Sequence, residues 1–229
     1  MKQIISVIQQ KGGVGKTTLA VHLAHEFRLQ NPGMRVVVAD ADPQQSAYKW
    51  VTRGNANGSN GVTAVLVAAD GDGKTLRQEL EAIQADLVIL DLPPAIESVS
   101  LRAALYADVI LVPVGASALD IEAGQAAISV CRDATTMDKT KTYLIVPSKI
   151  RQSTAAGREL STVLSSWGPI AKTSIGLRVA LADAATGGHG ICDFAPNSPA
   201  HQEITALAAE VAELLRRKAN GSAQTAIAS

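Results

Sequence analysis

Residues 10–18 read Gln10-Lys11-Gly12-Gly13-Val14-Gly15-Lys16-Thr17-Thr18, and they follow the apolar run Ile4-Ile5-Ser6-Val7-Ile8. The apolar run is typical of a buried strand, and residues 17–28 carry apolar side chains at helical spacing. A strand, a glycine-rich loop and a helix in this order predict a phosphate-binding loop, in which backbone N–H groups surround the phosphates of a nucleotide. We therefore predict that a nucleotide is bound by Gly12, Gly13, Val14, Gly15, Lys16, Thr17 and Thr18.

The loop departs from the ordinary phosphate-loop pattern, G-x-x-x-x-G-K-[ST]. Gln10 stands where that pattern has its first glycine, and Lys11 is an additional lysine. Lys16 is expected to meet the β- and γ-phosphate oxygens, and the Thr17 hydroxyl is expected to bind Mg²⁺. Two lysines therefore face one polyphosphate.

These residues resemble the deviant Walker A motif of the ParA/MinD family of P-loop ATPases, and the chain is most similar to the short ParA-type partition ATPases. The resemblance implies ATP and Mg²⁺ as cofactors and a homodimer that forms when ATP is bound. It also implies that Lys11 of one subunit contacts the nucleotide held by the other, which places Lys11 beside Lys16 in the catalytic set. A lysine amine can follow phosphate oxygens as their charge shifts during hydrolysis.

A second group of candidate residues follows the strand predicted over residues 35–39. Asp40 and Asp42 are two residues apart, so both project to the same side of an extended chain, at the strand end where open α/β sheets place ligands. The stretch Asp40-Ala41-Asp42-Pro43-Gln44 resembles the family's switch I segment. By this resemblance, Asp42 is catalytic because it orients or activates the attacking water, and Asp40 belongs to the outer shell of the metal. A solvated turn at the strand end is the alternative.

Asp91 ends a third apolar strand, Leu87-Val88-Ile89-Leu90, which is typical of a Walker B segment. Phosphoryl transfer needs a metal that bridges β and γ oxygens and neutralises developing charge. An aspartate at this position would hold a water bound to Mg²⁺. The metal site that we predict thus consists of Thr17, Asp40 and Asp91.

Composition and element order predict an α/β domain with a doubly wound, mostly parallel sheet flanked by helices. A chain of 229 residues can bury roughly three-quarters of its unfolded surface, and its aromatic content of 3% implies a core of Val, Ile, Leu and Ala. The predicted strands lie at about 3–9, 34–40, 62–67, 86–91, 108–114 and 141–147. We expect a single domain over 1–218 with no helical domain before the phosphate loop, a flexible connection over 53–61 and a disordered tail over 219–229.

Cysteine and histidine usage predicts no metal cluster. Cys131, on a predicted helix, and Cys192, in a predicted loop, have no C-x-x-C spacing. No cysteine follows Asp91 closely, which argues against iron–sulfur ligation of the kind found in nitrogenase iron proteins. The absence of a signal peptide or a long apolar run favours a reducing cytoplasm. His22 and His25 are expected on the surface of the first helix.

Three further segments concern the nucleotide base and the dimer interface, and their motifs are less specific than those above. Asp120 lies in a stretch that resembles a segment near the nucleotide of short partition ATPases, and an acidic residue in a first helical turn explains it equally well. Pro147 and Ser148 stand where many relatives carry an Asn-Arg pair that contacts the base. The prediction that the base is adenine therefore rests on the family resemblance alone. Pro196 lies in a stretch that resembles the loop packing against the base, and a helix-entry turn explains it nearly as well.

Charge gives little information about partners. The chain has 21 basic and 21 acidic residues, so DNA binding would depend on a local patch, which a dimer doubles. The candidate basic residues are Lys149, Arg151, Arg158, Lys172, Arg178, Arg216, Arg217 and Lys218. The last predicted helix, 200–218, has an apolar face and a basic end, but glutamates dilute its positive charge. This favours packing on the core over a role at a membrane surface.

The resemblance implies a ParA-type ATPase that binds DNA non-specifically as an ATP dimer and drives partition of a plasmid or chromosome. A ParB-like centromere-binding or adaptor protein would stimulate hydrolysis, and the protein would be cytoplasmic, on the nucleoid when ATP is bound. One alternative is that the same machinery positions a protein compartment such as a carboxysome. Another, from a different class, is a metabolic P-loop enzyme that uses ATP to activate a carboxylate.

Overall fold

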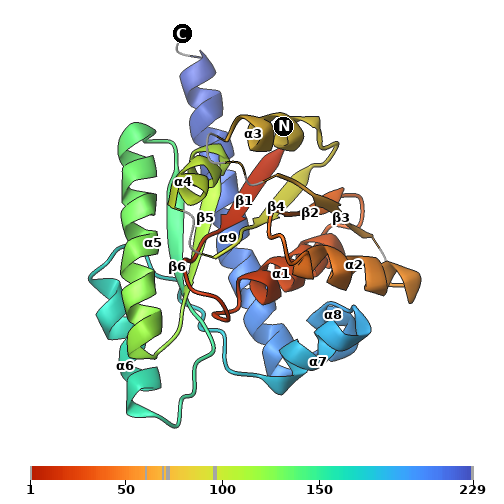
Figure 1. Ribbon diagram of the computed structural model, residues 1–229, viewed down its shortest axis with the longest axis vertical. Helices are drawn as coiled ribbons and strands as arrows, with labels where there is room; N and C mark the ends of the chain where they lie inside the picture. Colours follow the sequence, from red (N-terminus) through yellow and green to blue (C-terminus); the bar gives the residue numbers. More distant parts are fainter. Residues whose placement is uncertain (1, 60, 69, 71–72, 95–96, 228–229) are drawn as a thin grey trace.

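The phosphate loop leaves a central strand of a parallel sheet (Figure 1). The computed structural model describes residues 2–59, 61–68, 70, 73–94 and 97–227. Within these ranges the sheet has six strands in the order β3-β2-β4-β1-β5-β6, and every pairing is parallel. The strands are β1 (Gln3–Val7), β2 (Val36–Asp40), β3 (Val62–Leu66), β4 (Leu87–Asp91), β5 (Val109–Val114) and β6 (Thr142–Pro147). Each boundary lies within two residues of its predicted position, and the predicted α/β fold is confirmed.

Helices cover both faces of the sheet because the strands are apolar on both sides. In β2, Val36 and Val38 enter one buried cluster, whereas Val37 and Ala39 enter the other. Since side chains alternate along a strand, this pattern needs a helical layer on each face. One layer contains α1 (Lys16–Gln30), α2 (Ser46–Ala56), α7 (Val179–Gly187), α8 (Ile191–Phe194) and α9 (Pro199–Ile227). The other contains α3 (Lys74–Ala82), α4 (Glu97–Tyr106), α5 (Ala118–Met137) and α6 (Ala155–Ser165).

The carboxyl ends of three neighbouring strands lie level with one another. Val7 in β1 is opposite Asp91 in β4, and Asp91 is opposite Asp40 in β2. The loop that follows β1 therefore begins close to both aspartates. Open α/β sheets place ligands at this edge, so strand register alone brings the three predicted segments together.

Helix α1 is buried along most of its length, and this corrects the prediction for two histidines. His22 and His25 expose only 0% and 4% of their surface, so neither lies on the surface of the protein. The reason is that α7, α8 and α9 contact the side of α1 that the sheet does not cover. The His22 ring accepts a hydrogen bond from the Ile191 N–H (3.0 Å), and its Nε2 donates to the Leu181 carbonyl (3.1 Å).

Helix α9 packs on the core through its apolar face, which supports the interpretation chosen from its sequence. Its buried residues in the cluster shared with α1 are Ala200, Ile204, Leu207, Ala208, Val211 and Leu215. Among the described residues, no helix has the length and apolar character needed to cross a bilayer. The helix continues to Ile227, across the stretch for which the sequence favours a disordered tail. That stretch contains several alanines and no proline, which suits a helix, and 228–229 lie outside the described residues.

Two other segments differ from their predictions. Residues 53–56 belong to α2 instead of a flexible connection, because Arg53 donates to the carbonyls of Ala185 and Thr186 and so ties this turn to α7. Asn60, in the same predicted connection, lies outside the described residues. Cys192 lies in the short helix α8 and is buried, where a loop is predicted.

Candidate nucleotide site

The phosphate loop has the backbone conformation that its glycines predict. Gly13 and Gly15 have φ values of 79° and 101°, in the left-handed region that favours glycine. Helix α1 begins at Lys16 directly after Gly15, and no side chain caps it. The first N–H groups of α1 therefore have no intrahelical partner, and together with the helix dipole they form a site for an anion.

Thr17 and Asp91 lie in contact at the base of this loop. The Thr17 hydroxyl donates to Oδ2 of Asp91 over 2.6 Å. The other carboxylate oxygen, Oδ1, is buried and has no hydrogen-bond partner among the described residues. Burial raises the pKa of Asp91 to about 7, although the Thr17 hydrogen bond and the Lys16 charge act in the opposite direction. A carboxylate this isolated needs a cation or an ordered water beside it.

The residues present fit Mg²⁺. A hydroxyl and a carboxylate side by side are oxygen donors, which a hard cation prefers, and Mg²⁺ usually takes only one or two protein ligands beside substrate phosphates. Among the described residues, no group of three or more His, Cys, Asp and Glu side chains could hold a metal ion. A metal at this position would therefore depend on Thr17, Asp91 and the phosphates.

Lys16 is buried in the same site. Its ammonium donates to the Lys11 carbonyl within the loop over 3.2 Å. Burial lowers the pKa of Lys16, and the charges of Asp91 and Asp42 act against that shift. The ammonium thus lies inside the loop, close to where a polyphosphate would add negative charge.

The two aspartates after β2 make different contacts. Asp40 is buried, and its carboxylate accepts hydrogen bonds from the N–H groups of Asp42 and Tyr48, each over 2.9 Å. These bonds tie the strand end to the start of α2, so both Asp40 oxygens already have partners. Asp42 is half-buried, and its Oδ1 accepts from the Gln44 N–H over 2.9 Å. Of the pair, Asp42 is the one whose carboxylate can also reach solvent in the site.

Lys11 is held by its own chain. Its ammonium lies 2.6 Å from Oδ1 of Asp120 in the first turn of α5. The Ser117 hydroxyl donates to the other oxygen of Asp120, also over 2.6 Å. Although burial acts to raise it, these hydrogen bonds hold the pKa of Asp120 below its usual value. Asp120 is therefore both an acidic residue of a first helical turn and a neighbour of the phosphate loop, so the two interpretations of it are compatible.

A cavity of about 120 Å³ adjoins the loop at the start of α1. Its walls include Thr18 and Leu19 of α1, Ser148 and Lys149 after β6, and the segment 175–178. This position suits a nucleotide base. Pro196, which is predicted to contact the base, lies between α8 and α9 and is not among the residues that line the cavity. The sequence carries no motif that would have indicated residues 175–178.

Sequence comparisons relate this chain to one family model and to several known proteins. Residues 2–72 match a family model described as an AAA domain. Maintenance of carboxysome distribution protein A from Gloeobacter kilaueensis is 36% identical over 120 residues, which are 52% of this chain and 52% of that protein. Chromosome-partitioning ATPase Soj from Thermus thermophilus is 28% identical over 236 residues, covering 90% of this chain and 94% of Soj. The chain is thus similar to P-loop proteins of the ParA/MinD type.

Solved structures share the fold of this chain. Cyanothece apo McdA superposes with a TM-score of 0.71 at 17% identity, covering 95% of this chain and 99% of that one. Cobyrinic acid a,c-diamide synthase from Mycobacterium smegmatis, with bound ADP and magnesium, gives 0.68 at 17% identity, covering 92% and 94%. The fold is therefore shared by proteins of different function. The match to the Gloeobacter protein spans only about half of that relative's length (52%).

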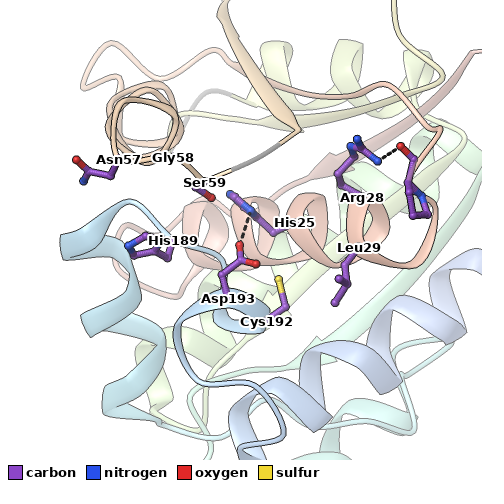
Figure 2. A pocket seen from close by; sticks show the side chains of 10 residues that line it. His25, Arg28, Leu29, Asn57, Gly58, Ser59, His189, Cys192 and Asp193 are labelled. Atoms are coloured by element: carbon purple, nitrogen blue, oxygen red, sulfur yellow. Dashed lines mark hydrogen bonds and ion pairs between the residues drawn. The ribbon is translucent and has the colours of Figure 1, made fainter.

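A larger cavity lies elsewhere among the described residues, at the other end of α1 (Figure 2). It has a volume of about 450 Å³ and is lined by His25, Arg28, Leu29, Pro32, Asn57, Gly58, Ser59, His189, Cys192 and Asp193. Nδ1 of His25 lies 3.5 Å from Asp193. None of the lining residues belongs to the phosphate loop, and a polyphosphate needs the N–H groups of that loop. We therefore assign the nucleotide to the smaller cavity.

The structure also separates the candidate DNA contacts of the chain into two groups. The first group makes ion pairs or hydrogen bonds within the chain and consists of Lys149, Arg158, Arg178, Arg216, Arg217 and Lys218. The second group is exposed and consists of Arg151 and Lys172. Lys149 and Arg178 also line the smaller cavity beside the phosphate loop.

Proposed function

We propose that this chain is a Mg²⁺-dependent ATPase that hydrolyses ATP to ADP and phosphate and dimerises when ATP is bound. The observation that carries the proposal is the contact of Thr17 with Asp91, whose second carboxylate oxygen is buried without a partner at the base of the phosphate loop. A carboxylate in this state is suited to hold a cation against a polyphosphate. Mg²⁺, when bound, neutralises charge on the β and γ oxygens.

Three side chains would bind the phosphates or orient the attacking water. The Lys16 ammonium, already inside the loop, would exchange the Lys11 carbonyl for phosphate oxygens. Asp42, half-buried at the same edge, would orient the attacking water through its carboxylate. Lys11 would leave Asp120 and contact the nucleotide held by a second copy of the chain. Its side chain is 34% exposed, so it can turn outward without unpacking the core.

We further propose that the ATP-bound dimer binds DNA without sequence preference and moves a plasmid or chromosome with the help of a ParB-like partner. The similarity to Soj and to ParA proteins supports this cargo. The similarity to a carboxysome distribution protein supports a second candidate, a protein compartment positioned by the same cycle.

A synthetase function has weaker support. Such an enzyme would need a substrate cavity within about 3–3.5 Å of the transferred phosphate. The large cavity of the described residues begins at His25, nine residues beyond Lys16 in α1. Nine residues of helix span about 13 Å, which is too far for direct transfer.

The test measures molecular mass by light scattering and retention on arbitrary DNA, with ATP, with ADP and without nucleotide. ATP alone should give a dimer that stays on DNA at low salt and leaves at high salt.

Lys16→Ala should abolish nucleotide binding. Asp42→Ala should keep ATP binding and the dimer but lower turnover by about 100-fold or more. A protein that remains monomeric with ATP and ignores DNA would refute the proposal, and normal turnover by the Asp42 variant would refute the assignment of that residue.

A further inference from the structure

Two consecutive side chains after β6 bind two consecutive carbonyls of the phosphate loop. The Ser148 hydroxyl donates to the Val14 carbonyl over 3.2 Å. The Lys149 ammonium donates to the Gly13 carbonyl over 2.5 Å. Ser148 is buried, and its own N–H donates to the Val114 carbonyl at the end of β5 over 2.8 Å. The contacts therefore connect the phosphate loop to the sheet.

Fixing these carbonyls also fixes N–H groups. In a trans peptide the carbonyl of one residue and the N–H of the next point in opposite directions. No cis peptide bond occurs among the described residues. Holding the Gly13 and Val14 carbonyls toward the β6 end therefore turns the N–H groups of Val14 and Gly15 the other way, toward the phosphate side of the loop.

The backbone at this position supports a specific role for Lys149. Its φ is 56°, in the left-handed region, which is unfavourable for a residue other than glycine. A Cβ added to Gly15 would lie 3.4 Å from the Ser148 hydroxyl and 3.7 Å from a Lys149 side-chain carbon. The connection after β6 thus lies closely against the loop, with a conformation that is retained despite its cost.

We infer that Ser148 and Lys149 are positioning residues that hold the phosphate loop in its anion-binding conformation through the Val14 and Gly13 carbonyls. The inference rests on the proposed function for the identity of the anion. It assigns Lys149 a role in nucleotide affinity, where its charge and partial exposure alone would suggest a contact with DNA. Both residues act through the loop and not on the reacting atoms.

The decisive variant is Lys149→Met, which keeps much of the side chain but has no donor. Because the loop surrounds the α- and β-phosphates, we expect the Kd values for Mg²⁺-ATP and Mg²⁺-ADP to rise together by about 5–20-fold, the loss of one hydrogen bond to a charged donor. The KM for ATP should rise in parallel while kcat changes less than about twofold. Lys149→Arg, which keeps a donor, should recover most of the affinity. Ser148→Ala should act in the same direction.

A second variant distinguishes the effect of losing the Lys149 amine from the effect of the positive φ at this position. Lys149→Gly accepts the positive φ without strain but also lacks the amine, so it should match the Met variant in affinity. The matched control is Lys139→Met, an exposed lysine between α5 and β6, which should bind nucleotide like the parent.

The outcomes distinguish this inference from the function on which it rests. If the parent protein binds no ATP, the proposed function fails. If the parent binds ATP and Lys149→Met binds both nucleotides equally well, the inference is wrong. Loss of ATP affinity alone would also overturn it, because that pattern indicates a direct contact with the γ-phosphate. Loss of DNA retention with normal nucleotide affinity would overturn it in favour of a DNA contact.

Discussion

The imidazole of His22 illustrates how a single buried group can set a response to pH. It lies edge-on to Trp50, with ring centroids 5.0 Å apart, and both ring nitrogens have backbone partners. Burial lowers the pKa of His22 to about 3. Because the Ile191 N–H donates to Nδ1, only the neutral ring with a proton on Nε2 satisfies both contacts.

We predict that acid destabilises the protein through His22. Below about pH 6.5 the unfolded chain binds a proton at this residue that the folded chain rejects, so the free energy of unfolding falls as the pH falls from about 6.5 toward about 3. The slope is at most about 1.4 kcal/mol per pH unit, or about 2 kcal/mol at pH 5. Melting temperatures of the parent and of His22→Leu, measured from pH 5 to 8, provide the test.

The variant should be less stable than the parent at pH 7, by about 2–4 kcal/mol, because it leaves two buried backbone groups without partners. Its melting temperature should nevertheless fall less steeply with acid. Parallel curves for the two proteins would show that His22 is not the group responsible.

At the scale of residues, the sequence predicts those parts of the site that lie in continuous motifs. Lys16, Thr17 and Asp91 could be named from spacing, because strand register alone brings these segments together. The contact of Lys149 with the Gly13 carbonyl could not be predicted, because the two residues are 136 positions apart and no pattern marks the contact. The contact of Pro196 with the base stays a prediction, and residues 175–178, which line the smaller cavity, carry no motif that would indicate them.

At the scale of elements, α9 shows how one helix completes the burial of another. Leu207 is fully buried in the cluster that includes α1, and the Glu26 carboxylate of α1 lies 2.9 Å from His201 of α9. Helices of one layer therefore stabilise each other as well as the sheet.

We predict that Leu207→Ala lowers the free energy of unfolding by about 2–5 kcal/mol, because it leaves a cavity in this cluster. Leu29→Ala is the matched control, since Leu29 lies on α1 and is 52% exposed. Its effect should be below about 1 kcal/mol. Denaturant unfolding of both variants measures the difference. Similar losses for the two variants would mean that α9 contributes little to the core.

The sequence predicts the bounds of the strands closely, but it does not predict which helices cover α1. Each strand is a run of apolar residues buried on both faces, a pattern that needs no knowledge of its neighbours. The burial of His22 and His25 depends on α7, α8 and α9, which follow more than 140 residues later. Polar side chains on a helix predict exposure unless such distant coverage is known.

At the scale of the whole molecule, the proposed dimer predicts complementation between two inactive variants. Lys11→Ala should lack the amine that acts on the other subunit, and Asp42→Ala should lack the water-orienting group of its own subunit. In a mixed dimer the Lys11→Ala subunit keeps its own Asp42 and receives Lys11 from its mate. With random mixing, half of the dimers are mixed and each has one complete site, so turnover should recover to roughly a quarter of the parent value.

ATP turnover of the separate and mixed variants measures this effect. Mixing Asp42→Ala with Lys16→Ala, a pair that leaves neither site complete, serves as the control. If mixing restores no activity although the mixed dimer forms, Lys11 acts within its own subunit, and the proposed exchange between subunits is wrong.

The contact between Lys11 and Asp120 has a consequence for how such a protein would sense its nucleotide. The Lys11 ammonium of each subunit is neutralised by Asp120 of the same subunit. Breaking this ion pair costs free energy, which association of the two subunits must offset. A triphosphate in the opposing subunit offers a denser negative charge than one carboxylate, and a diphosphate offers less. In the proposed dimer, an ion pair inside the solitary subunit thus makes assembly depend on the third phosphate, and loss of that phosphate returns each lysine to its resting partner.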